Sequence, residues 1–213
     1  MIKIIPAHKS HEHADLIDQM FRLRAKVFAG RLDWQVQVIN GWERDRFDDL
    51  EPLYVVSVDD DGRVLGTFRL LQTTGPTMLF HVFSACLPEG LVVRSPIIWE
   101  STRFCADTTL AKERGDHGLA EITGELLAAL LEIGVEAGLS YVVTVIDVRM
   151  ERILRRASCP IERLGDPVLI GGVPTLAIFM ETTPETVARM HAKNNIREAV
   201  LPPGAIANLR TAA

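Results

Sequence analysis

The stretch from Ile97 to Cys105 restricts the possible folds of this chain more than any other. β-Branched and aromatic residues dominate it, so it predicts a β-strand. The stretch nevertheless contains a carboxylate, Glu100, and a guanidinium, Arg103. An ionised group that is buried without a partner costs several kcal/mol, so both groups need partners elsewhere or a polar cleft. A structural salt bridge and a functional site both satisfy this requirement.

The length, composition, net charge and cysteine content of the chain favour one globular domain in a reducing compartment. With 213 residues, of which 47% are hydrophobic, the chain is long enough to bury a sizeable core. A net charge of −5 gives no basic field that would attract nucleic acid or anionic lipid. No apolar run approaches the roughly 20 residues of a membrane span, and the first residues lack a signal-peptide layout. Cys86, Cys105 and Cys159 are widely spaced, as is typical of a reducing cytosol, so we expect a cytoplasmic protein with no nucleic-acid or membrane partner.

Apolar periodicity predicts helices alternating with strands. The expected strands are 1–5, 54–58, 64–71, 97–105, 141–146, 168–170 and 176–180, and the expected helices are 13–29, 119–137, 149–157 and 184–192. A hairpin signal at 59–62 makes two strands antiparallel, while later strands alternate with helices. This order predicts an α/β fold, a single-domain three-layer sandwich with a mixed sheet flanked by helices. We expect the domain to cover 1–193 and the tail, 194–213, to be loosely ordered.

Six charged residues lie where apolar neighbours predict burial, or in the loop and strand between such stretches. They are Arg24, Asp45, Asp48, Arg69, Glu100 and Arg103. Arg24 lies in the apolar stripe of the first helix, which predicts a buried carboxylate partner. One pair would be a structural bridge, whereas six such groups in one domain indicate a site that orients a substrate. Arginine and carboxylate together suit a ligand that carries both a carboxylate and an ammonium.

Two loops add weaker signals. Residues 30–50 form a long polar segment with Trp34 and Trp42, which either close over a ligand or anchor the loop on the core. Residues 107–117 form a polar loop before a helix, with glycines that favour an anion cradle. The spacing of Arg114 and Gly118 is one residue too long for the pyrophosphate loop of acyl-CoA N-acyltransferases.

We expect no metal site, because the His-Glu-His run at 11–13 has the wrong spacing for a helical ligand pair.

An ordered series of motifs resembles the acyl-homoserine-lactone synthases, the LuxI-type autoinducer synthases of bacterial quorum sensing. The motifs are FRLRAKVF at 21–28, RLDW at 31–34, ERDRFDD at 43–49, GTFRLL at 66–71, GPTML at 75–79 and WESTRF at 99–104. The second half is similar more loosely, through MERILRRA at 150–157 and RLG at 163–165. The resemblance covers residues 20–181, and its series of Arg, Phe, Trp, Asp, Asp, Arg, Glu and Arg is highly specific.

The resemblance implies a fold related to the Gcn5-type N-acyltransferases and a transferase reaction with two substrates. These are S-adenosylmethionine and a fatty acyl thioester on acyl carrier protein, with no permanently bound cofactor. The methionine amine would attack the thioester, and the carboxylate would then close a lactone and displace methylthioadenosine. Alternatives are a synthase that uses acyl-CoA and a Gcn5-like acetyltransferase that acts on another amine.

The resemblance also implies roles for residues. Glu100 would take the proton of the amine, while Arg24, Asp45, Asp48, Arg69 and Arg103 orient the amino-acid end. Phe28 and Trp34, together with Arg103 and Phe104, would contact S-adenosylmethionine. The acyl pocket would be formed by Thr144, Met78, Phe83, Val142, Leu154 and Leu176, with the Thr144 hydroxyl favouring a 3-oxo chain. Arg149, Arg152 and Arg156 either form a solvated helix face or dock the carrier protein.

Overall fold

The computed structural model describes residues 1–202 and 204–206. Its internal contacts divide the chain into two compact units, each made of two segments. The first unit contains 1–70 and 103–129, and the second contains 71–102 and 130–213. Three elements, β5 (Val64–Gln72), β6 (Ile98–Ala106) and α4 (Gly118–Glu136), contribute residues to both units.

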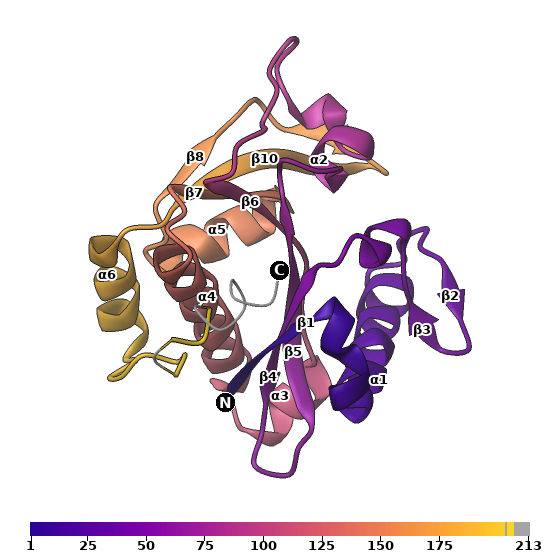
Figure 1. Cartoon of the computed structure of the whole chain (residues 1–213), viewed down its shortest axis with the longest axis vertical. Helices are drawn as coiled ribbons and strands as arrows, with labels where there is room; N and C mark the ends of the chain where they lie inside the picture. Colours follow the sequence, from indigo (N-terminus) through magenta and orange to yellow (C-terminus); the bar gives the residue numbers. More distant parts are fainter. Residues whose placement is uncertain (203, 207–213) are drawn as a thin grey trace. The chain divides into compact units, whose positions relative to one another are not determined.

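The first unit holds most of the N-terminal elements, drawn in indigo and purple in Figure 1. They are β1 (Ile2–Pro6), η1 (Ala7–His13), α1 (Ala14–Ala25), η2 (Lys26–Arg31), β2 (Val38–Ile39), β3 (Trp42–Glu43), η3 (Arg46–Asp49) and β4 (Leu53–Val58). The unit also contains α3 (Thr108–Glu113), which comes later in the chain and is pink in Figure 1. Antiparallel pairing joins β1 to β4 and β4 to β5, with Tyr54 opposite Arg69. Directly opposed residues share one face of a sheet, so Tyr54 and Arg69 point the same way.

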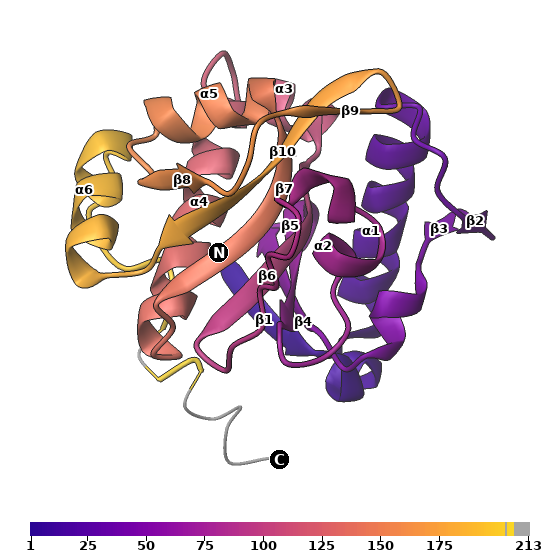
Figure 2. The same cartoon turned by 90° about the horizontal axis from the view of Figure 1, so that it is seen from above.

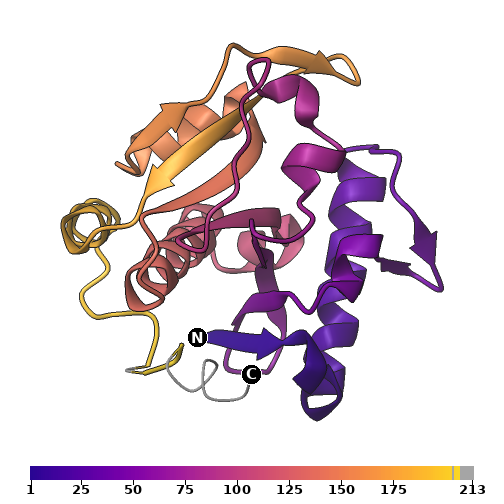
Figure 3. The same cartoon turned by 45° about the horizontal axis from the view of Figure 1, so that its top comes forward.

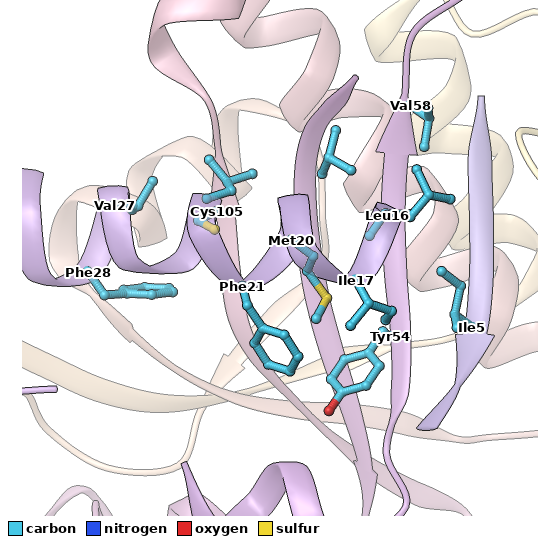
Figure 4. Packing of buried hydrophobic residues seen from close by; sticks show 13 residues of the cluster. Ile5, Leu16, Ile17, Met20, Phe21, Val27, Phe28, Tyr54, Val58 and Cys105 are labelled. Carbon is cyan, nitrogen blue, oxygen red and sulfur yellow. The ribbon is translucent and has the colours of Figure 1, made fainter. Parts of the chain in front are cut away.

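Helix α1 packs on that face through its apolar stripe. Ile17, Met20 and Phe21 are buried against Ile5 and Tyr54, as Figure 4 shows. The spacings of three and four residues place the stripe on one side of the helix. Each such side chain contributes about 1.5–3 kcal/mol when it is fully buried, so this contact is a main source of stability for the unit.

The other face of β5 lies against the first turns of α4. A Cβ atom on Gly66 would be 2.7 Å from Leu126 Cδ1 and 3.0 Å from the carbonyl oxygen of Cys105. Glycine is therefore required for this close approach of strand and helix. Ser57, opposite Gly66, donates a 2.5 Å hydrogen bond to Glu125 of α4.

The second unit contains the mixed part of the sheet. Its elements are α2 (Met78–His81), η4 (Ser84–Cys86), β7 (Tyr141–Asp147), α5 (Val148–Arg156), β8 (Ile161–Arg163), β9 (Val168–Ile170), β10 (Val173–Glu181) and α6 (Pro184–Asn194). β6 pairs with β7 in parallel, and β10 pairs antiparallel with β7, β8 and β9. Figure 2 shows α2 beside β6 and β7. The predicted mixed α/β sheet with flanking helices is confirmed.

Every predicted strand and helix is present, but two predicted loops contain further structure. Within the predicted polar loop 107–117, Asp107 accepts hydrogen bonds from the N–H groups of Thr109 and Leu110 and so caps α3. Within 30–50, Asn40 and Gly41 have φ of 53° and 84° and turn the chain between β2 and β3. Both central residues of a type I′ turn need positive φ, which Asn-Gly adopts readily. The short strand β8 was also not predicted.

The last described residues contact α4. The N–H groups of Val200 and Leu201 donate hydrogen bonds to Glu132, and that of Ile206 donates to Glu136. Residues 203 and 207–213 lie outside the described residues, so the boundary at 193 and the loose tail stay predictions. Within the described residues, no helix combines the length and the apolar character needed to cross a membrane.

Candidate active site

The end of α1 gives the site its aromatic wall. The helix continues from Lys26 as a π-helical turn, a rare form that is frequent at functional sites. This turn holds Phe28, whose ring is buried and stacks on Trp34 with centroids 5.1 Å apart. The main-chain N–H of Trp34 donates a 2.8 Å hydrogen bond to the carbonyl of Phe28, which fixes the pair. Trp34 itself stays 44% exposed, so one side of this wall is open to solvent.

Arg24 lies on the buried face of α1 and is 1% exposed. Its Nε donates to Glu43 at 2.6 Å, while its two terminal nitrogens donate to the two oxygens of Asp48 at 2.8 and 2.9 Å. The predicted buried carboxylate partner is therefore confirmed. Two partners rather than one satisfy the fork of the guanidinium, a geometry that lysine does not reproduce.

Asp48 is the centre of this network, because two arginines meet at its side chain. Besides Arg24 it contacts Arg69 Nη1 at 2.8 Å and accepts hydrogen bonds from Tyr54 Oη and the N–H of Asp45. Burial opposes both charges, but the mutual hydrogen bonds and attraction raise the pKa of Arg24 and lower the pKa of Asp48. Burial, reinforced by the Asp48 charge, raises the pKa of Tyr54, which keeps its hydroxyl a neutral donor.

Arg69 and Arg103 complete the network around Asp45. Arg69 donates to both oxygens of Asp45 at 2.7 and 3.1 Å, and Arg103 Nη2 lies 2.7 Å from Asp45 Oδ2. Arg103 also donates to Glu43 at 2.9 Å, and its Cζ lies 5.3 Å from the centre of the Phe28 ring. The Asp45 side chain is 18% exposed, whereas Asp48 and Glu43 are fully buried. Asp45 is therefore the carboxylate of this group that solvent reaches.

Arg103 adopts a strained backbone conformation, with φ of 58° inside β6. This left-handed region is uncommon for residues other than glycine, asparagine and aspartate. Such strain persists only where surrounding interactions hold it, and it is concentrated at functional sites. The ion pairs of Arg103 with Glu43 and Asp45 supply those interactions.

Glu43 belongs to the network but was not among the predicted site residues. It joins Arg24 to Arg103 and its side chain has no exposed surface. The signal that could have revealed it is the Asn40-Gly41 turn, which makes Trp42 and Glu43 a hairpin strand rather than loop. The three arginines are thus matched within the first unit by three carboxylates: Glu43, Asp45 and Asp48.

Glu100 belongs to the second unit and is 1% exposed. Its two oxygens accept hydrogen bonds from the N–H groups of Met78 at 2.8 Å and Leu79 at 2.6 Å, at the start of α2. Free N–H groups at a helix start are a suitable partner for a carboxylate. The assignment of Glu100 as proton acceptor stays a prediction.

The two tryptophans of the 30–50 segment have different environments. Trp42 stacks on Phe21 with centroids 5.2 Å apart and donates a 2.9 Å hydrogen bond from Nε1 to Asp18. These contacts anchor the β2–β3 hairpin on α1. Figure 3 shows the hairpin beside this helix. Trp34 contacts Phe28 and remains the tryptophan available to a ligand.

Phe104 is not part of the arginine network. Its ring stacks on Phe68 with centroids 6.0 Å apart. Phe68 precedes Arg69 in β5, and neighbouring strand residues point to opposite faces. Phe104 therefore contacts the face of β5 opposite to the one that carries Arg69, and its predicted contact with S-adenosylmethionine stays untested.

The six predicted acyl-pocket residues do not share one surface. Phe83 and Leu79 pack with Val143 and Ala177, so they lie on one face of β7 and β10. Alternation sends the side chains of Val142, Thr144 and Leu176 to the opposite face of these strands. Leu154 is buried on α5, and Met78 is buried at the start of α2. The second unit thus offers two apolar faces, and the acyl roles of these residues stay predictions.

Cysteine chemistry is disfavoured at this site. Cys86, Cys105 and Cys159 are free, buried thiols. Burial raises the pKa of Cys105 to about 12, so the nucleophilic thiolate is scarce near neutral pH. Groups of histidine, cysteine and carboxylate side chains suited to a metal ion do not occur in 1–202 and 204–206.

The mixed α/β fold of this chain is one that N-acyltransferases also adopt. The chain matches the fold of an N-acetyltransferase from Lactobacillus plantarum described as putative, with a TM-score of 0.54 at 16% identity over 85% of this chain and 99% of that one. This likeness concerns the fold alone. The predicted likeness of fold to the Gcn5-type acyltransferases is thereby confirmed.

The family is narrower than this class. A model of the autoinducer synthase family matches residues 7–190, so the chain belongs to that family. It is 42% identical over 192 residues to an acyl-homoserine-lactone synthase of Agrobacterium fabrum (strain C58 / ATCC 33970), covering 90% of this chain and 86% of the relative. The chain is thus an acyl-homoserine-lactone synthase, as the motif series predicts.

Two solved structures support the same assignment. The crystal structure of the synthase LasI matches with a TM-score of 0.80 and 31% identity, over 90% of this chain and 94% of that one. The CoA-dependent synthase BjaI, solved with S-adenosylmethionine and isopentyl-CoA, matches with a TM-score of 0.84 and 25% identity over 99% of both chains. Relatives of similar fold therefore include a CoA-dependent enzyme.

Proposed function

We propose that this synthase makes a quorum-sensing lactone in the cytoplasm from S-adenosylmethionine and a fatty acyl group on acyl carrier protein. The observation that carries the proposal is the network of three arginines, of which Arg24 and Arg69 are buried, and three carboxylates beside the Phe28–Trp34 stack. S-adenosylmethionine brings an ammonium, a carboxylate and an adenine ring, which match a carboxylate, a guanidinium and an aromatic wall respectively. The complex of BjaI with S-adenosylmethionine supports this choice of substrate.

The reaction has two steps. The amine of S-adenosylmethionine loses a proton to Glu100, directly or through water, and its nitrogen attacks the thioester carbonyl. The new C–N bond replaces the C–S bond, and the carrier thiol leaves. A carboxylate oxygen then attacks the carbon next to the sulfonium, so that a C–O bond forms as the C–S bond to methylthioadenosine breaks. The thioester is already activated, so orientation of the amine and the carbonyl supplies much of the rate.

Some residues of the network contact the substrate, and others hold these residues in position. Asp45 is the carboxylate of this group that reaches solvent, so it is the one placed to contact a substrate ammonium. Arg24, Asp48 and Arg69 are the deeper members of the network. Arg69 and Asp48 hold Asp45, and Glu43 and Asp45 hold Arg103. The adenine stacks on the exposed face of Trp34, and the buried ring of Phe28 supports Trp34 from its other face.

The experiment is turnover with S-adenosylmethionine and an acyl-carrier-protein panel, with the lactone and methylthioadenosine measured by mass spectrometry. The wild type should release both products in equal amounts. Glu100→Gln should lower kcat by about 100-fold or more, a typical loss for a positioned proton acceptor. The size-matched control is Gln72→Glu on exposed β5 surface, which should leave kcat unchanged. Unchanged lactone output from Glu100→Gln would remove Glu100 from the mechanism.

The acyl donor has two candidates, and the donor panel separates them. An acyl-CoA donor is the second candidate, because the similarity to CoA-dependent BjaI covers almost the whole chain. Arg152→Glu combined with Arg156→Glu should raise the KM for the acidic carrier protein while leaving an acyl-CoA donor unaffected. Equal damage with both donors would count against carrier docking on α5.

Thr144 supports a 3-oxo acyl chain. Its side chain is buried on β7, where its hydroxyl could donate a hydrogen bond to the additional carbonyl. Removal of a hydrogen bond to a buried polar group disfavours the ligand that carries the group. Thr144→Ala should therefore lower the fraction of 3-oxo product relative to unsubstituted product. A constant ratio of the two products would eliminate this role.

A further inference from the structure

One side of α5 carries an exposed stripe that the reaction chemistry does not use. Arg149, Arg152, Ile153 and Arg156 are spaced three or four residues apart, so they share one side of the helix. All four side chains are exposed, and Ile153 keeps 44% of its surface in solvent. Helix α5 lies at the outer edge of its unit in Figure 2.

The charges of this stripe are not compensated within the described part of the chain. Arg155 and Arg163 both bind Glu151, at 2.9 and 2.8 Å, which lowers the pKa of Glu151 to about 2. Arg149, Arg152 and Arg156, by contrast, form no ion pair with any described carboxylate. Three free guanidinium groups therefore surround one aliphatic side chain on a protein whose net charge is −5.

The stripe stands on a firmly held helix. Asp147 caps the helix start through a 2.7 Å hydrogen bond from the N–H of Met150. Glu151 ties the middle of the helix to Arg163 on β8, and Leu154 is buried beneath it. Asn194 Nδ2 donates to the carbonyl of Ala157 just past the helix end. A preformed surface loses little conformational entropy when a partner binds.

We propose that Ile153 is the apolar anchor with which this stripe docks the acyl carrier protein. Protein interfaces combine a desolvated apolar centre with a charged rim, and the centre contributes most of the affinity. An acidic partner complements the three arginines, and an apolar residue on it would cover Ile153. A small anion such as a CoA phosphate would use the arginines but not the isoleucine. This inference rests on the proposed carrier-protein donor.

The arginines of the stripe and Ile153 should differ in how salt changes their contribution to carrier binding. Contacts of exposed arginines weaken as salt shortens the Debye length, whereas an apolar contact does not. Arg152→Gln should therefore weaken binding at about 50 mM NaCl and have a much smaller effect at about 300 mM. Ile153→Ser should weaken binding by a similar factor at both salt concentrations.

The experiment measures the Kd of fluorescently labelled acyl carrier protein for the intact synthase, together with kcat/KM for the acylated carrier. Ile153→Ser should raise Kd about tenfold, the equivalent of about 1.4 kcal/mol. The matched control is Leu169→Ser, which removes a 72% exposed leucine from β9 and should leave Kd unchanged. The KM for S-adenosylmethionine should not change in either variant, and circular dichroism should show equal melting temperatures.

The outcomes separate this inference from the proposed function. If Ile153→Ser binds the carrier like the wild type while Arg152→Glu weakens binding, the arginines dock the carrier alone and the anchor is overturned. If the carrier does not bind the wild type and acyl-CoA sustains turnover, the donor itself is wrong and the anchor falls with it. The anchor would also be overturned if Ile153→Ser bound the carrier like the wild type but no longer bound phosphatidylserine vesicles that the wild type binds. The stripe would then be a membrane contact.

Discussion

Arginines serve opposite purposes in two regions of this synthase. Arg24 and Arg69 are 1% exposed in the first unit and are held by carboxylates on more than one side. Arg152 and Arg156 in the second unit project into solvent and have no carboxylate partner among the described residues. A buried arginine is essential to its partners, because each would be left as an uncompensated charge, whereas an exposed arginine is available to another molecule.

The largest effect should come from a buried arginine. Arg24→Met keeps an unbranched side chain but leaves Glu43 and Asp48 without their shared donor. Breaking a buried ion pair on one side costs about 3–5 kcal/mol, so the free energy of unfolding should fall by that amount. Urea unfolding followed by circular dichroism measures it. A loss below about 1 kcal/mol would mean that the network is not a stabilising unit.

Acid should affect the buried region next. The pKa of Asp48 is lower in the folded chain than in the unfolded one, so its ionisation contributes stability above its unfolded pKa of about 3.9. That contribution is lost as the pH falls below this value towards the folded pKa. Asp48→Asn should lose about 2–3 kcal/mol at pH 7, a loss typical of charged hydrogen bonds, and should lose less at pH 3. Unfolding curves between pH 3 and 7 test this, and parallel losses at all pH values would contradict it.

A smaller effect should follow from the hydroxyl that supports the network. Tyr54→Phe keeps the ring packed against Phe21 but removes the hydrogen bond to Asp48. Because both arginines still hold Asp48, the free energy of unfolding should fall by about 1–2 kcal/mol. Differential scanning calorimetry should show a lower melting temperature with the fold retained. An unchanged melting temperature would show that the hydroxyl finds equal partners elsewhere.

The smallest effect on stability should come from the exposed region. Arg152→Gln breaks no ion pair of the described residues, and surface changes of this kind rarely affect stability. The melting temperature should move by no more than about 2 °C. The same variant is the matched control for Arg24→Met, since both remove one guanidinium. A large destabilisation by Arg152→Gln would remove the contrast between the two regions.

Much of the fold could be predicted from local patterns. The apolar stripe of α1 was readable at spacings of three and four residues, and Arg24 within it implied a buried acid. α3 escaped prediction because its sequence is short and polar, and its start depends on one capping side chain, Asp107. The β2–β3 hairpin was missed although Asn40-Gly41 indicates it, because only two residues on each side form strands.

The sequence predicted the kind of site, a cluster of buried arginines and acids, better than it predicted which residues pair with one another. An arginine in an apolar stripe must have a partner, but the sequence does not say which acid lies nearby. Asp48 was correctly expected in the network, whereas Glu43 was overlooked because loop and strand acids look alike in sequence. The sequence likewise does not show that Phe104 stacks on Phe68, away from the face of β5 that carries Arg69, and its predicted contact with S-adenosylmethionine stays a prediction.

The sequence by itself determined the class of this protein, because burial of charges in apolar stretches and an ordered motif series depend only on residue type and spacing. The tertiary structure decided which charges meet. Ion pairs act over a few ångströms between residues 19 to 60 positions apart in the chain, as with Arg24 and Glu43 or Arg103 and Glu43. It also decided which arginines stay free for a partner, since exposure is a property of the folded surface rather than of the residue.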